Sequence, residues 1–194
     1  MWALIEDNNI TEVLNRPKAL TIGDVQYPAN IFTLWSVEEK EAIGIYELVI
    51  DGTNLKDEKY YINGSETFTF ADGVAKKAFE TATAKALDDV TDEDGNTTRG
   101  LKYNHKQVIN QQAASLLQPT DWYVIREADG GTAVPANITT YRAAVRTKAN
   151  DMCDAIDAVA DVDALAALYE YTNTGTEESP EFTRPLGEWP TLGS

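Results

Sequence analysis

The stretch from Leu116 to Arg146 constrains the fold most, because it holds the densest run of helix boundary signals in the chain. Thr120 or Asp121 is suited to cap a short helix, and Pro119 stands at its first turn, where a missing backbone N–H costs no hydrogen bond. Trp122, Ile125 and Arg126 then fall on one side of this helix, and Gly130 and Gly131 end it. The pattern predicts a short helix, a corner, and a second helix beyond it.

The second helix is expected to carry one apolar face. Residues that recur every three or four positions define it, namely Ile138, Tyr141, Val145, Met152 and Val159. Some of them also recur at intervals of seven, which raises the alternative of a self-associating coiled coil, but the second row of such a seam includes Lys148. Packing against neighbouring helices of the same chain is therefore favoured, and the self-associating seam is the alternative.

The same stretch, LLQPTDWYVIREADGGTAVPANITTYRAAVR, resembles the phage tail assembly chaperone family, whose pattern is roughly LL..TDW......G...P.....YR..LR. The matching positions are Leu116, Leu117, Thr120, Asp121, Trp122, Pro135, Tyr141, Arg142, Val145 and Arg146. The two ends of the chain, WALIEDNNITEVLNRPKALTIGDVQYP and RPLGEWP, are similar to tail or fibre proteins of marine phages. The resemblance implies a tailed-bacteriophage protein that works on or in the tail or its fibres, either as a virion part or as a transient chaperone.

Composition and charge exclude several classes of partner. The chain has 43% hydrophobic and 25% charged residues, which is typical of a globular protein, and a net charge of -16. Such a charge repels phosphate backbones and anionic lipid heads, so we expect neither nucleic acid nor a membrane as partner. Met1 is followed by WALIED, without the basic start of a signal peptide. We expect synthesis in the host cytoplasm and a final location in the virion tail.

The first part of the chain is expected to form strands. Residues 2–5 and 10–14 flank Asp7-Asn8-Asn9, and residues 19–22 and 25–27 flank Gly23-Asp24. Both pairs read as hairpins that share one sheet.

A capping box follows these strands, with Ser36 as the cap and Glu39 three residues later. It predicts a short helix as far as Ile43, and residues 45–50 then read as another strand. Residues 67–70 and 74–79 predict one more hairpin. Together these elements define an expected β-rich domain over residues 1–87.

The rest of the chain divides into three parts. Residues 88–100 are acidic, contain two glycines and no aromatic residue, and predict a linker loop. Residues 101–172 predict a helical domain. Residues 173–194 contain three prolines and predict an extended C-terminal arm without regular structure, laid in a groove of its own chain or of a partner.

Six residues are the expected partner contacts. The resemblance and the apolar groups of the arm nominate Trp122, Tyr141, Arg142, Arg146, Leu186 and Trp189.

No residue pattern nominates catalysis, a cofactor or a metal. His105 is the only histidine and is expected to be a surface or helix-cap residue, and Cys153 is the only cysteine, expected near a helix seam. The acidic run at Asp92 fails as a calcium loop, since its glycine comes too early and Tyr103 stands where a glutamate is required.

The expected fold class is α+β, with a small antiparallel β-sheet domain, a helical hairpin or bundle, and an extended arm. The expected function is that of a non-enzymatic structural component of a phage tail or tail fibre that binds other tail or fibre proteins. A homo-oligomer is a further candidate assembly. A transient assembly chaperone is the alternative. A glycan-binding or glycan-hydrolysing receptor module is a third hypothesis, although no pair of carboxylates is nominated for it.

Overall fold

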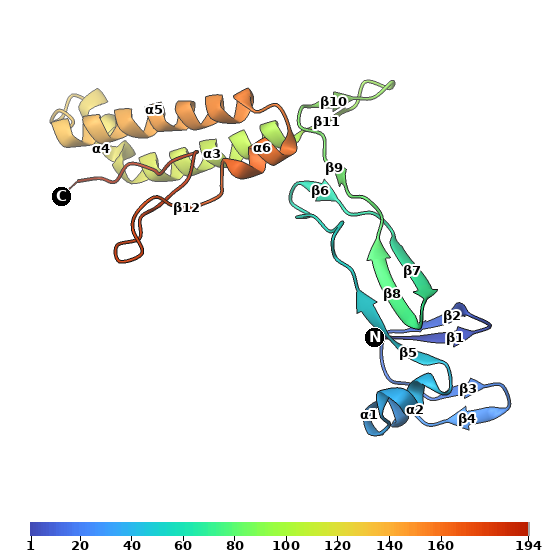
Figure 1. The fold of residues 1–194 in the computed structure, drawn as a ribbon. Coiled ribbons are helices and arrows are strands. Elements are labelled where there is room, and N and C mark those ends of the chain that lie inside the picture. The colour runs from blue at the N-terminus through green and yellow to red at the C-terminus, as the bar shows by residue number, and fades with distance from the viewer. Residues whose placement is uncertain (194) are drawn as a thin grey trace. The chain divides into compact units, whose positions relative to one another are not determined.

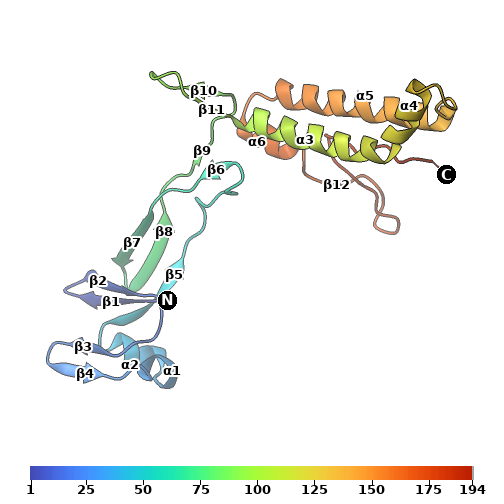
Figure 2. The same ribbon diagram turned by 180° about the vertical axis from the view of Figure 1, so that it is seen from behind.

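The computed structural model describes residues 1–193, and Ser194, the last residue of the expected arm, lies outside them. The chain divides into two compact units, Met1–Thr83 and Ala84–Ser194 (Figures 1 and 2). The first consists mainly of strands and the second mainly of helices, so the general α+β class holds.

Unit 1 is built on a five-stranded sheet in the order β2-β1-β5-β8-β7. Its strands are β1 (Trp2–Glu6), β2 (Asn9–Leu14), β5 (Ile45–Ile50), β7 (Glu66–Ala71) and β8 (Val74–Phe79). All neighbours are antiparallel except β5 and β8, which run parallel. The expectation of an antiparallel sheet is therefore wrong at this pair. The long connection after β5 returns the chain through β7 first, so β8 lies beside β5 in the same direction.

Tight turns close the two hairpins of this sheet. Asp7 and Asn8 both have positive φ between β1 and β2, at 48° and 63°, and Asp72 and Gly73 do so between β7 and β8, at 51° and 76°. Asn, Asp and Gly tolerate this conformation best. Both hairpins match the sequence-based prediction.

The second hairpin of the chain does not join this sheet. Strands β3 (Leu20–Ile22) and β4 (Val25–Tyr27) pair only with each other, which corrects the expectation of a shared sheet. Their apolar side chains pack on the core instead of extending the hydrogen-bonded ladder. Pro28 directly after β4 also lacks the donor that a longer strand would need.

Two short helices follow, α1 (Ile31–Leu34) and α2 (Val37–Glu41). The capping box is formed, because the Ser36 hydroxyl accepts from the Glu39 backbone N–H at 3.2 Å and the Glu39 carboxylate accepts from the Ser36 N–H at 2.8 Å. The helix ends two residues before the expected Ile43. Gly44 closes it with φ of 81°, and a side chain there would meet the Ile5 carbonyl oxygen at 2.5 Å.

The core of unit 1 covers both faces of the sheet. On one face, α1 and the β3–β4 hairpin bury a cluster made of Leu4, Leu14, Leu20, Ile31, Phe32 and Ile45. On the other, Ala3, Leu48 and Ala75 lie under partly buried aromatic and aliphatic residues of β2, β5 and β7. The outer strands β2 and β7 contact each other, so the sheet curls over this second cluster.

Residues 88–100, the expected linker loop, contain regular structure. After β6 (Tyr61–Ile62) and β9 (Thr83–Ala84), strands β10 (Val90–Thr91) and β11 (Thr97–Thr98) form a small hairpin. The Asp92 carboxylate closes its turn by accepting from the backbone N–H groups of Asp94 and Asn96 at 3.0 and 2.8 Å. A polar hairpin of this kind needs no apolar core, which is why composition alone suggested a loop.

Unit 2 is organised around two long helices that pack together, α3 (Leu101–Leu117) and α5 (Ala136–Ala158). The 3₁₀ helix Gln118–Thr120 and α4 (Asp121–Ala128) connect them. The buried face of α5 consists of Ile138, Arg142, Val145, Ala149, Met152 and Ile156. The apolar row expected from the sequence thus packs within its own chain, with Tyr141 and Val159 only half-buried.

The end of the chain returns to the helices. After α6 (Val162–Ala167), strands β12 (Thr172–Asn173) and β13 (Phe182–Thr183) form a hairpin, so the arm does contain regular structure, contrary to expectation. Asn173 makes this possible, since its side-chain oxygen accepts from the backbone N–H groups of Gly175 and Glu181. Beyond β13 the Leu186 N–H donates to the Leu168 carbonyl at 3.0 Å, and the Trp189 indole N–H donates to the Gln112 side chain on α3.

Candidate binding surfaces

Helix α4 presents its apolar side chains to solvent. None of its residues is buried, and Trp122 and Ile125 are 50% and 67% exposed. The two lie three positions apart, so they share one side of the helix, as the sequence predicted. Large apolar groups exposed together are typical of contact surfaces.

Aromatic stacking fixes the shape of this surface. The rings of Trp122 and Tyr123 stack with centroids 3.8 Å apart, and the Arg126 guanidinium lies over both, at 4.9 and 5.3 Å. Arg126 is itself held by the carbonyls of Thr132 and Ala133 in the following loop. The surface is therefore a preformed aromatic platform, which loses little conformational entropy when a partner binds. Sequence reasoning placed Arg126 on this face but gave it no role.

Arg142, one of the expected partner contacts, is buried within unit 2. It is 7% exposed and donates to the Leu117 carbonyl at 2.9 Å and to the Thr120 hydroxyl at 2.6 Å. It also pairs with the Asp121 carboxylate at 2.8 Å. The last turn of α3 leaves carbonyl groups without helical partners, and Arg142 satisfies one of them. Its place in the motif is therefore structural.

Thr120 differs from expectation for the same reason. Its hydroxyl donates back to the Leu117 carbonyl at 2.7 Å and accepts from Arg142, and it makes no cap bond to α4. The 3₁₀ turn through Pro119 holds Thr120 in helical geometry, so the side chain points away from the N–H groups of α4.

Tyr141 and Arg146 differ in accessibility. Tyr141 is half-buried and its hydroxyl donates to the Leu116 carbonyl at 3.4 Å, whereas Arg146 lies exposed one turn further along α5. Of these two predicted contacts, Arg146 is the more accessible.

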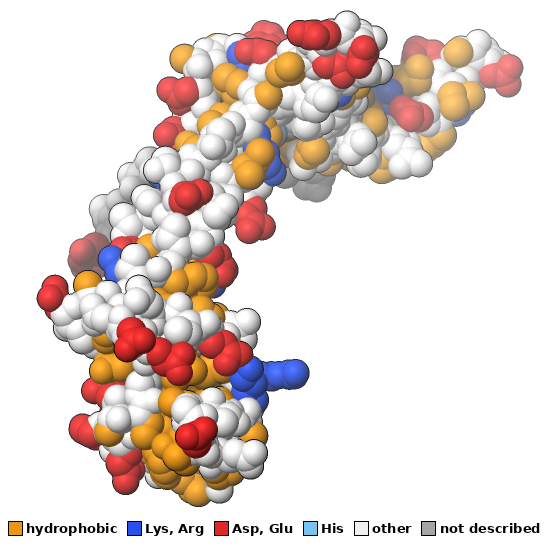
Figure 3. Space-filling view, turned by 90° about the vertical axis from the view of Figure 1, so that its right-hand side faces the viewer, with side chains coloured by type: hydrophobic (Ala, Val, Ile, Leu, Met, Phe, Trp, Pro, Cys, Tyr) orange, Lys and Arg blue, Asp and Glu red, His pale blue; other side chains and the backbone are white. Residues whose placement is uncertain are grey.

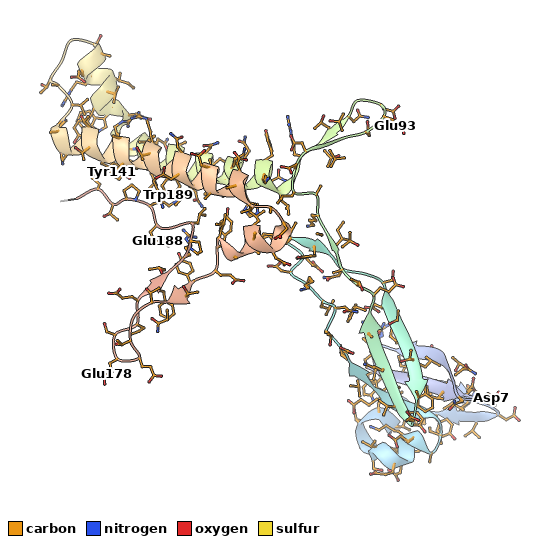
Figure 4. The ribbon with its side chains drawn as sticks, turned by 45° about the horizontal axis from the view of Figure 1, so that its top comes forward. Asp7, Glu93, Tyr141, Glu178, Glu188 and Trp189 are labelled. Carbon is orange, nitrogen blue, oxygen red and sulfur yellow. The ribbon has the colours of Figure 1, made fainter. Side chains whose placement is uncertain are left out.

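The arm is anchored on unit 2 at two points. Leu186 is 3% exposed, and the Trp189 indole N–H donates to the Gln112 side-chain oxygen at 3.0 Å. Leu186, one of the expected partner contacts, is thus buried as an internal anchor of the arm. Tyr141 and Trp189 are both labelled in Figure 4, on the side of the helix pair along which the arm runs.

A groove remains open between α3 and the arm. Its volume is about 590 Å³, and it is lined by Val108, Gln111, Gln112, Ser115, Leu116, Arg184 and Trp189. The sequence nominated only Trp189 among these. Gln112 and Arg184 carried no signal, because polar residues on an exposed helix face and in a proline-rich tail have no distinctive pattern.

His105 is buried rather than exposed, which corrects the sequence-based expectation. It is 8% exposed, and its Nδ1 lies 2.7 Å from the Tyr169 hydroxyl oxygen. It occupies the α3 face that meets the end of α6, where the hydrogen bond to Tyr169 satisfies a ring nitrogen that water cannot reach. This histidine joins two helical segments.

Charged side chains near the start of α3 neutralise one another. Lys102 pairs with Asp88 at 3.2 Å and Lys106 with Asp157 at 2.7 Å. The Gly100 N–H and the Arg99 side chain lower the pKa of the Asp89 carboxyl. Burial raises the pKa of the half-buried Cys153 thiol on α5, so the thiolate form is disfavoured.

Within residues 1–193, histidine, cysteine and acidic side chains nowhere gather in groups of three or more that could hold a metal ion. In the same range, no helix has the length and apolar character required to cross a bilayer. Comparisons with protein-family models, with curated proteins and with solved structures each found no match for the chain.

Proposed function

We propose that the chain is a non-enzymatic structural component of a tailed-bacteriophage tail or tail fibre and acts through protein–protein contacts. The observation that carries this proposal is the exposure of Trp122 and Ile125 in the motif that resembles the phage tail assembly chaperone family. Had these residues been buried, the motif would be explained by folding alone.

The residues of the motif have two different structural roles, and this supports the same proposal. Arg142, Thr120 and Asp121 hold the two helices in place, while Trp122 and Arg126 form the platform that this scaffold presents. A rigid aromatic anchor with an arginine is the composition typical of strong contact sites in protein interfaces. Other tail or fibre proteins are the proposed partners and the virion tail is the proposed location.

A transient assembly chaperone is the second candidate. The resemblance itself favours it, and a chaperone would use the same platform to hold a client until assembly. The two candidates differ in where the protein ends up.

The test is quantitative mass spectrometry of gradient-purified particles of the phage that encodes the chain. A constant ratio to other tail proteins would establish a virion component. Presence in the infected lysate and absence from the particle would establish the chaperone instead, and absence from both would refute both candidates.

A matched pair of variants tests whether the surface of α4 is responsible for incorporation or client binding. Ile125→Ser should reduce incorporation, or client binding for a chaperone. Ile62→Ser changes a residue of similar exposure, 61%, in unit 1 and should leave both unchanged. If the two variants behave alike, the apolar surface of α4 is not responsible for incorporation or client binding.

A further inference from the structure

The β12–β13 hairpin carries two exposed aromatic rings on one face. Phe182 is 62% exposed and Tyr171 52% exposed. In the ladder Asn173 is opposite Phe182 and Thr172 is opposite Thr183. Side chains alternate between the faces of a strand, so Tyr171, Asn173 and Phe182 belong to the same face.

The contact between Arg184 and the Tyr171 ring agrees with this assignment. The charge of Arg184 is paired with a carboxylate of the same chain. Its guanidinium lies 5.1 Å from the centroid of the Tyr171 ring, and its Nε donates to the Gly187 carbonyl at 3.1 Å. It also pairs with Glu188, whose carboxylate accepts from the Tyr171 hydroxyl at 2.7 Å. The Tyr171 ring is thereby held in place, while its companion Phe182 stays open to solvent.

The sequence around this face is acidic apart from Arg184, whose charge is paired with that of Glu188. From Ala149 through Thr183 there is no lysine or arginine, and the acidic residues of this run are Asp151, Asp154, Asp157, Asp161, Asp163, Glu170, Glu177, Glu178 and Glu181. The hairpin itself holds the last three. It projects from the helices of unit 2, with Glu178 near its tip (Figure 4).

The charge of this surface indicates which class of partner it can bind. The net charge of the whole chain is -16, and red acidic side chains are more numerous than blue basic ones in the view of Figure 3. Phosphate-rich ligands and anionic lipids are repelled by such a surface, whereas lysine and arginine are attracted to it. Two aromatic rings on one hairpin face supply an apolar anchor of the kind that interfaces use at their centre.

We infer that the aromatic face of the β12–β13 hairpin, Tyr171 and Phe182 with Glu177, Glu178 and Glu181 around it, docks a basic polypeptide segment in which Lys or Arg alternates with apolar residues. The apolar residues cover the two rings, and the cations lie against the glutamates. This deepens the proposed function, on which it rests, by adding a second contact surface and the chemistry of its partner.

The test measures binding of a short fluorescein-labelled peptide in which lysine alternates with phenylalanine, using fluorescence anisotropy and the full chain. Phe182→Ser should raise the Kd about fivefold or more, as expected for loss of an aromatic anchor. The triple variant Glu177→Gln, Glu178→Gln, Glu181→Gln should weaken binding and reduce its dependence on salt between about 0.05 and about 0.3 M. A peptide with glutamate in place of lysine should not bind.

Ile62→Ser is the matched control, since Ile62 is 61% exposed but lies outside the hairpin. The inference is overturned if Ile62→Ser weakens binding as much as Phe182→Ser, or if the hairpin variants bind like the wild type. Because Phe182 is exposed, circular dichroism of its variant should match that of the wild type. Particle mass spectrometry is independent of this assay. If the wild-type chain is present in particles but does not bind the lysine–phenylalanine peptide, the hairpin inference fails and the proposed function stands.

Discussion

The Arg142 side chain on α5 donates a 2.6 Å hydrogen bond to the hydroxyl oxygen of Thr120, 22 residues earlier in the chain. The same guanidinium reaches the Leu117 carbonyl and the Asp121 carboxylate. One buried cation thus joins α5 to the end of α3, to the 3₁₀ turn and to the start of α4. It therefore connects α4, which carries the aromatic platform, to the helix pair.

Replacing Arg142 by alanine should destabilise unit 2 by about 2 to 4 kcal/mol, because the Leu117 carbonyl and Thr120 hydroxyl lose their shared donor. Asp121 is half exposed, so water compensates for part of its loss. Urea unfolding followed by helical circular dichroism measures the effect. Arg146→Ala, on the same helix but exposed, should change stability by less than about 0.5 kcal/mol. Equal effects of the two variants would show that the buried network does not stabilise the unit.

Trp122→Ala should have a smaller effect on stability, about 1 to 2 kcal/mol, because half of the indole is already in water. The loss consists of its stacking on Tyr123 and its contact with Arg126. A buried tryptophan would cost about 3 to 5 kcal/mol. The same unfolding measurement distinguishes the two ranges, and Met152→Ala, at 1% exposure, gives the scale for a core position on α5.

The sequence predicted several local elements because their signals are local. The Ser36–Glu39 capping box and the turn at Asp7-Asn8 depend on residues a few positions apart, and both are formed. Trp122 was also correctly grouped with Ile125 from helical spacing. What the sequence could not show was which face of α4 would meet the rest of unit 2.

The features that the sequence did not predict depend on contacts between residues that are distant in the chain. The parallel pairing of β5 with β8 depends on the path of the chain through β7, and no residue type marks it. His105 was expected at the surface or as a helix cap, and Arg142 was nominated as a partner contact by the resemblance. Both are buried, because partners distant in the sequence satisfy their hydrogen bonds. These are Tyr169 for His105, and Leu117, Thr120 and Asp121 for Arg142.

Leu186→Ala should release the arm without unfolding the helices. Leu186 is the buried anchor of that segment, and the free energy of opening the arm should fall by about 2 to 4 kcal/mol. Hydrogen exchange at the Leu186 amide, which donates to Leu168, reports the change. Leu192→Ala is the control, since Leu192 is 45% exposed and its change should leave this amide protected. Protection that survives Leu186→Ala would mean that other contacts hold the arm.

Cys153 should react slowly with iodoacetamide. Burial raises the pKa of its thiol, and only the thiolate attacks the reagent. The rate in the folded protein should therefore keep rising at pH values where the thiol unfolded in urea is already fully ionised. Simple shielding would lower the rate at every pH without moving the midpoint of this profile. A midpoint equal to that of the unfolded chain would contradict the prediction.

Asp51 should make unit 1 sensitive to acid. Its hydrogen bond with Lys76, and then its bonds with Thr53, lower the pKa of the carboxyl in the folded state. A carboxyl of this kind stabilises the fold at pH above its unfolded pKa of about 3.9, and the contribution is lost as the pH falls through the lower, folded value. Asp51→Asn removes the charge at every pH. The variant should therefore be less stable than the wild type at neutral pH, with the difference shrinking below about pH 4.

Urea unfolding of both proteins at a series of pH values, followed by a probe in unit 1, measures this difference. Glu6→Gln is a suitable control, because Glu6 is an exposed carboxylate of the same unit and is not among the partners of Asp51. The difference between this variant and the wild type should stay constant over the same pH range. A constant difference for Asp51→Asn as well would show that the Lys76 and Thr53 contacts do not favour the ionised carboxylate in the folded protein.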